Sequence, residues 1–159
     1  TPPTEKVPVT FALLLNLVSA SNAENKETLW GFISSYSVGA SPQQYPLLDQ
    51  LAGYALVYYE NFVKPNKNYR APTASEAAAL NSLKSEIEAL PEETQASDIQ
   101  TIVFSVGKEH EYENLREWFG ALYEILLGQK EGPRMGSFIA LYGKDKFIDL
   151  INQALKSKN

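Results

Sequence analysis

The stretch Thr73-Ala-Ser-Glu-Ala-Ala-Ala-Leu-Asn-Ser-Leu-Lys-Ser-Glu-Ile-Glu-Ala-Leu-Pro91 decides the fold class. Thr73 and Glu76 have the spacing of a capping box, in which each side chain bonds the other residue's backbone N–H at the start of a helix. Apolar residues then recur at threes and fours, which is helical periodicity. Since Pro91 cannot continue a helix, the pattern predicts a helix over about 74–89. Its predicted inward face is Ala77, Leu80, Leu83 and Ile87, with Lys84 at the exposed edge.

The same period extends through the rest of the chain, and strands find little support. Further helices are predicted over about 8–20, 25–36, 47–63, 98–108, 112–127, 136–142 and 144–156. Pro8 is predicted to open the first of them and Ser97 to cap the fourth. Tyr58 and Tyr59 fit the apolar period of 47–63 and are predicted to be core. The expected fold is an all-α bundle of seven to eight short helices, a single domain over 1–159 with subdomains of about 1–90 and 91–159.

Composition excludes several classes of site. Cysteine is absent from the 159 residues, so disulfides and thiolate metal sites are ruled out, and His110 is the only histidine. No metal site is therefore expected. Residues 9–20 are apolar like a secretory signal, but Asn16 interrupts them and the run is too short to span a bilayer. A start at Thr1 rather than methionine suggests a piece of a longer protein.

Catalytic residues are not expected in this chain. His110 lies in the polar run 108–111, which is more typical of a solvated stretch than of a triad. Several carboxylates follow it, and they would have to converge in a cleft to serve a hydrolase: Glu109, Glu111, Glu113, Glu117 and Glu124. A charge run at the start of a helix is usually a solvated face that favours the helix dipole.

The formal net charge of −5 argues against indiscriminate nucleic-acid binding, but it hides an asymmetry. Residues 76–124 hold eleven acidic and three basic side chains, whereas the remainder holds eight acidic and eleven basic ones. An acidic middle with basic flanks permits a local positive surface. It equally permits a protein–protein interaction module that docks through the acidic middle segment, and this alternative stays open.

Two predicted loops carry the candidate binding residues. In loop 64–72, Lys64, Lys67 and Arg70 accompany Tyr69, and cations with an aromatic ring suit phosphates and unpaired bases. In loop 128–136, glycines allow close approach of a ligand, and Arg134 precedes a helix start that offers free N–H groups. The plainer alternatives are a solvated loop after a helix and a simple helix-to-helix turn.

Four stretches resemble the C-terminal part of class I lysyl-tRNA synthetases, and they occur in the same order. They are Leu14-Leu-Asn-Leu-Val-Ser-Ala-Ser-Asn-Ala23, Tyr36-Ser-Val-Gly-Ala-Ser-Pro42, Tyr58-Tyr-Glu-Asn-Phe-Val-Lys-Pro65 and Gly132-Pro-Arg-Met-Gly-Ser-Phe-Ile-Ala-Leu-Tyr-Gly143. The ending over 142–151 also resembles the terminal helix of glutamyl-tRNA synthetases. The resemblance covers most of residues 8–156.

This resemblance implies a helical, cage-like domain, similar to that of glutamyl-tRNA synthetases, which receives the anticodon of lysine tRNA. It also implies an upstream catalytic domain of the same chain that uses ATP, and a cytoplasmic location without membrane or DNA partners. The two ATP-handling signatures of class I synthetases, His-x-Gly-His-like and Lys-Met-Ser-Lys-Ser-like, have no counterpart here. The segment itself is therefore expected to bind no cofactor and to have no activity in isolation.

The residues expected to contact RNA follow from chemistry rather than from the family. Uracil at the second and third anticodon positions stacks weakly, so selectivity should depend on hydrogen bonds to its edge. Arg70 and Arg134 are the expected side-chain donors, and the backbone N–H groups of Gly136 and Ser137 are expected to add others. The residues expected to bind phosphates or to stack are Lys64, Lys67, Lys130, Lys144 and Tyr69.

Overall fold

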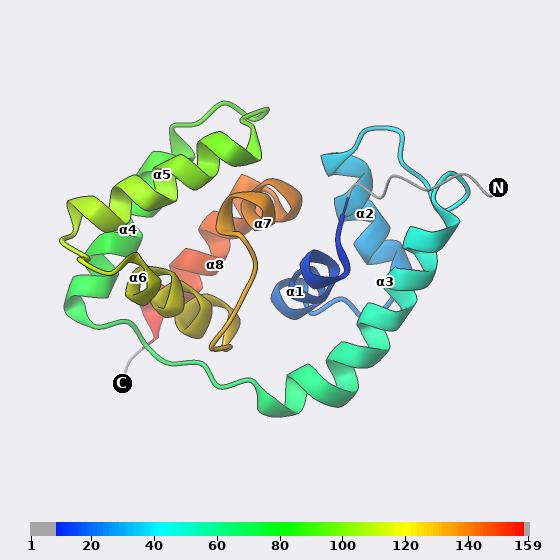
Figure 1. Ribbon diagram of the computed structural model, residues 1–159, viewed down its shortest axis with the longest axis horizontal. Coiled ribbons are helices and arrows are strands. Elements are labelled where there is room, and N and C mark those ends of the chain that lie inside the picture. Colours follow the sequence, from blue (N-terminus) through cyan, green and yellow to red (C-terminus); the bar gives the residue numbers. More distant parts are fainter. Residues whose placement is uncertain (1–8, 158–159) are drawn as a thin grey trace. The chain divides into compact units, whose positions relative to one another are not determined.

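The computed structural model describes residues 9–157, and all regular structure within them is helical (Figure 1). The α-helices are α1 (Phe11–Ser21), α2 (Lys26–Tyr36), α3 (Pro46–Tyr58), α4 (Ala74–Glu88), α5 (Ala96–Glu109), α6 (Leu115–Leu122), α7 (Met135–Tyr142) and α8 (Lys144–Lys156). Three short helical pieces join them: the π-helices η1 (Tyr59–Val63) and η3 (Tyr123–Leu127), and the 3-10 helix η2 (Lys64–Asn66). The predicted all-α class is confirmed.

The chain divides into two compact units between Asn66 and Lys67. Unit 1 holds α1 to α3 with η1 and η2, and unit 2 holds α4 to α8 with η3. The division therefore lies in the connection that follows α3.

Unit 1 is built around α3, which packs against both α1 and α2. Its core consists of fully buried aliphatic side chains: Leu14, Leu17, Val18, Leu29, Ile33 and Leu48. The carboxylate of Asp49 joins α3 to α2, because it accepts the indole N–H of Trp30 at 2.9 Å and the ammonium of Lys26 at 2.9 Å. The Lys26 bond, followed by that of Trp30, lowers the pKa of Asp49.

Two details of unit 1 differ from the expectations. Pro8 lies outside the described residues, and within them Thr10 caps α1 by accepting the N–H of Leu13. Tyr59 is buried as predicted, whereas Tyr58 is 45% exposed. The apolar residues of α3 thus extend beyond the face that neighbouring helices cover. Tyr54, also on α3, is 68% exposed for the same reason.

Unit 2 is centred on α5 and α7, which pack closely together, while α4 contacts both α5 and α8. Its largest fully buried side chains are aromatic: Trp118, Phe138 and Phe147. The indole N–H of Trp118 donates to the backbone oxygen of Val103 at 2.9 Å, which fixes α6 against α5. This core positions the two predicted loops, which both contribute residues to unit 2.

The helix starts in unit 2 depend on local capping. The capping box of Thr73 and Glu76 is present at α4, as predicted. The prediction that Ser97 caps the next helix is wrong, because α5 already begins at Ala96 after an extended Gln95. The helix predicted over 112–127 begins later, at Leu115, where the Asn114 side chain accepts the N–H of Arg116.

Candidate nucleic-acid interface

The two predicted loops meet within unit 2. The backbone N–H of Asn68 donates to the backbone oxygen of Gly128 at 2.8 Å. The ring of Tyr69 lies directly on Gly128, so that a Cβ at this position would come within 2.9 Å of a ring carbon. Gly128 also has a φ of +68°, which side chains rarely adopt. A glycine therefore allows the segment after Lys67 to lie against the turn that ends η3.

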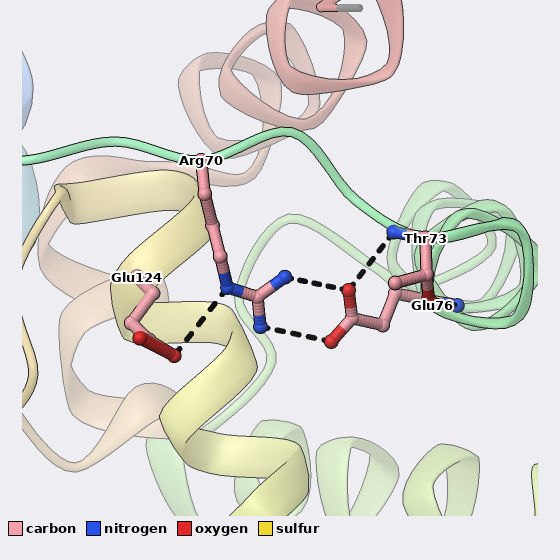
Figure 2. Close-up of polar contacts among 4 residues, drawn as sticks. All are labelled: Arg70, Thr73, Glu76 and Glu124. Atoms are coloured by element: carbon pink, nitrogen blue, oxygen red, sulfur yellow. Dashed lines mark hydrogen bonds and ion pairs between the residues drawn. The ribbon is translucent and has the colours of Figure 1, made fainter. Parts of the chain in front are cut away.

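Arg70 fastens the same segment to α4 and η3 of unit 2 (Figure 2). Its Nη1 and Nη2 donate to the two carboxylate oxygens of Glu76 at 2.7 and 2.9 Å, and its Nε lies 3.5 Å from Oε2 of Glu124. Glu76 also accepts the backbone N–H of Thr73 at 2.9 Å. Hydrogen bonding to Arg70 is the main cause that lowers the pKa of Glu76. The guanidinium expected to read a base thus has its donors on two carboxylates of its own chain.

The lysines expected to hold phosphates differ in their surroundings. Lys64 lies in unit 1 and forms an exposed ion pair with Glu60 at 3.2 Å. The Lys67 ammonium lies 5.0 Å from the centre of the Tyr69 ring. Lys144 donates to the backbone oxygen of Leu90 at 2.6 Å, and its side chain is only 19% exposed. Lys144 therefore joins the start of α8 to the turn after α4.

The second loop presents its cations to solvent. The backbone oxygen of Pro133 accepts the hydroxyl of Tyr123 at 2.8 Å, and Gly132 lies against the Tyr123 ring, where a Cβ would come within 2.4 Å. Lys130 and Arg134 are both exposed. The guanidinium of Arg134 donates only to the hydroxyl of Ser137 within the described chain, at 3.2 Å, and thus stays at the start of α7.

Gly136, expected to offer its N–H to RNA, has a packing role instead. Its N–H already donates to the Oε1 atom of Gln100 at 2.7 Å. A Cβ at this position would lie 2.2 Å from the backbone oxygen of Ala96. The absence of a side chain therefore lets α7 approach the backbone of α5.

A hollow of about 700 Å³ lies beside this loop, between α5 and α6. Its lining includes Phe104, Phe119 and Tyr123, together with Arg116 and Lys130. The rings of Phe104 and Phe119 meet edge to face, with centroids 5.2 Å apart. Of these five residues, only Lys130 is among the predicted contacts.

The other four, Phe104, Arg116, Phe119 and Tyr123, are not among the contacts that the sequence predicted. A signal was available for Phe104, because a large aromatic side chain there falls outside the α5 face defined by Ile99, Val103 and Val106. Phe119 is only half-buried, although its residue type is typical of a core position.

Histidine and the acidic side chains are the candidate ligands and acid–base groups of this chain. Residues 9–157 contain no group of three or more His, Cys, Asp or Glu side chains that could hold a metal ion. The Nε2 atom of His110 lies 2.8 Å from the hydroxyl of Ser82, so this half-buried histidine links the end of α5 to α4, while Lys108, Glu109 and Glu111 around it are exposed as predicted. Over the same range, no helix has the length and apolar character that crossing a membrane requires.

No protein-family model matches the chain. Curated proteins are similar to nearly its whole length, and they are ligases of the aminoacyl-tRNA synthetase class. This chain is therefore homologous to a region of such a synthetase.

The particular relatives are lysine–tRNA ligases. That of Rickettsia bellii strain OSU 85-389 is 45% identical over 154 residues, 97% of this chain and 30% of the relative. The enzyme of Rickettsia felis is 42% identical over 157 residues (99% and 30%), and that of Roseobacter denitrificans is 44% identical over 153 residues (96% and 29%). The chain spans about 30% of the length of these relatives.

Proposed function

We propose that this chain is the anticodon-binding region of a class I lysine–tRNA ligase. Its role is to hold the uracil-bearing anticodon loop of lysine tRNA, while a separate part of the enzyme binds ATP and carries out the ligation in the cytoplasm. Two findings support this proposal: the similarity to lysine–tRNA ligases, and an arginine and a lysine exposed on one loop beside an aromatic hollow.

The observation that carries the proposal is the environment of Arg134. Within residues 9–157 this guanidinium has no carboxylate partner, in contrast with Arg70. Guanidinium groups donate to base edges, and uracil depends on such bonds because it stacks weakly. Arg134 is therefore the residue proposed to read uracil, with Ser137 beside it. Lys67 and Lys130 are proposed to neutralise phosphates, and Tyr69 to stack on a base.

The remaining predicted contacts have other tasks in this proposal. Arg70, Gly136 and Lys144 hold the two loops and the helix starts in place through the intramolecular bonds described above. Lys64 belongs to unit 1 and remains a candidate for a separate phosphate contact.

The test is a titration of the chain with fluorescent stem-loops. One carries the lysine anticodon, and a second carries cytosine in place of uracil at the second and third anticodon positions. Arg134→Ala should lower the preference for the first loop by about 1–3 kcal/mol, because a base-reading bond is lost. Lys67→Ala should weaken both loops alike. Arg134→Lys, which keeps the charge without the planar fork, should behave like Arg134→Ala in selectivity.

If Arg134→Ala lost affinity equally for both stem-loops, Arg134 would contact a phosphate rather than uracil. Absence of binding to either loop at low salt would contradict the proposal as a whole. That second outcome would favour docking of a protein partner on the acidic segment 76–124.

A further inference from the structure

The hollow between α5 and α6 has an aromatic surface that solvent reaches. Phe104 is 38% exposed, although burial of such a ring is favourable. Phe119 supports it edge to face, and Tyr123 is fixed in orientation by its bond to the Pro133 oxygen. A flat aromatic surface of this kind suits another flat ring, because stacking in an offset or edge-to-face arrangement is favourable.

Cations from two different elements flank this aromatic surface. Arg116 lies on α6 and Lys130 on the loop after η3, and both are exposed. Neither has an ion-pair partner in the part of the chain that the structure describes. Glu131 is the acidic residue in the lining, so the cations outnumber it. An aromatic surface between cations fits a base whose neighbouring phosphates lie on either side.

The loop of Arg134 and the hollow are physically continuous. Lys130 and Gly132 line the hollow, and the Pro133 oxygen is bonded to Tyr123 of its wall. Gln100, which accepts the N–H of Gly136 at the start of α7, lines the hollow as well. An RNA strand that contacts Arg134 therefore has an aromatic hollow beside it.

We propose that this hollow stacks one unpaired base of the RNA whose uracil is read by Arg134, with Arg116 and Lys130 on the flanking phosphates. This inference rests on the proposed function and adds a second contact of a different kind. Ring faces recognise any base, so the hollow contributes affinity without choosing uracil. In this proposal Arg134 provides selectivity for uracil, and Phe104 provides affinity for any base.

The experiment uses the same two stem-loops with Phe104→Ala. Loss of the stacking surface should weaken binding of both loops by a similar factor, about 5- to 150-fold. Phe104→Trp keeps an aromatic face and should bind like the native chain. A 2-aminopurine placed in the loop should be quenched by the native chain at the stacked position and stay bright with Phe104→Ala. Far-UV circular dichroism of each variant checks that the helices are intact.

The phosphate contact of Arg116 is tested by the salt dependence of RNA binding. Arg116→Gln should reduce the slope of log affinity against log salt by about 0.7, the value for one phosphate contact on a single strand. Lys108→Gln removes an exposed cation of α5 outside the lining and is the matched control.

Native affinity and an unchanged salt slope in both Phe104→Ala and Arg116→Gln would overturn the hollow as a base site. The proposed function would survive that result if Arg134→Ala still lost its preference for uracil. If the native chain bound neither loop at low salt, both proposals would fall together.

Discussion

At the scale of single residues, Glu76 has two roles, and the local spacing of the sequence reveals only one of them. Its bond to the Thr73 N–H is local and follows from the spacing of a capping box. Its pairing with Arg70 also decides the role of that arginine, together with Glu124. Arg70 and Glu124 are 54 positions apart in the chain, so no local pattern could predict their contact.

Glu76→Gln separates these two tasks, because glutamine also completes a capping box while it removes the charge. We expect the free energy of unfolding at neutral pH to fall by about 1–2 kcal/mol, since charge-assisted bonds to Arg70 are lost. The pKa of the native Glu76 carboxyl lies below its ordinary value of 4.5. Its contribution is therefore complete above that value and is lost as the pH falls through the lowered pKa.

Urea unfolding at a series of pH values between about 6 and 3 checks this expectation. The stability of Glu76→Gln should depend less on pH than that of the native chain. Asp49, whose pKa is lowered too, should leave a residual slope of the same sign. Parallel curves for the two proteins would contradict the assignment to Glu76.

At the scale of elements, the packing of α7 on α5 depends on Gly136. Gly136→Ala would bring a Cβ to 2.2 Å from the backbone oxygen of Ala96, and backbone cannot move aside as a flexible side chain can. We expect a loss of about 1–3 kcal/mol in the free energy of unfolding, the usual cost of overpacking. Thermal unfolding followed by circular dichroism measures it.

Gly120→Ala is the matched control for this prediction. Gly120 lies in α6, and nothing is within 4 Å of a Cβ placed there. Because alanine favours a helix more than glycine does, this variant should gain up to about 1 kcal/mol. Equal effects of the two substitutions would show that helix propensity, not the contact with Ala96, governs Gly136.

The helices themselves were predictable because their signals are local. Proline, asparagine and the capping box set most helix boundaries to within a few residues. The predicted cap at Ser97 was wrong because Gln95 precedes α5 without a side-chain hydrogen bond to the helix. The exposed rings were less predictable. Tyr58 has both the residue type and the period of a core position, so only the number of neighbouring helices decides whether its ring is covered.

At the scale of the whole molecule, the net charge of the chain has the opposite sign to the charge of its proposed RNA contacts. The chain carries −5, yet the proposed RNA contacts of unit 2 include the cations Lys67, Arg116, Lys130 and Arg134. Lys67, Arg116 and Lys130 are the ones proposed to lie on phosphates, so with one phosphate of a single strand each the slope of log affinity against log salt should be about −2. Titration of the lysine anticodon stem-loop at several potassium chloride concentrations between about 50 and 200 mM measures it.

A slope near zero would contradict phosphate binding by these cations. The lysine anticodon loop with neutral methylphosphonate linkages is a control, since its affinity should be nearly independent of salt.

The division into units was not predictable in the same way as the fold class. The sequence predicts a loop over residues 64–72 with helical periodicity on both sides, and nothing local marks this loop as a boundary between units. The segment after Lys67 belongs to unit 2 because of distant bonds, from Asn68 to Gly128 and from Arg70 to Glu124. Tertiary contacts, not local propensity, decide where unit 1 ends.

The chain has two tryptophans, and each unit contains one of them: Trp30 in unit 1 and Trp118 in unit 2. Both indoles are buried and donate to an oxygen, Trp30 to the Asp49 carboxylate and Trp118 to a backbone carbonyl. Replacing either by phenylalanine leaves one tryptophan, whose emission can be excited selectively over that of the nine tyrosines. The wavelength and intensity of its emission then report the unfolding of one unit without an attached dye.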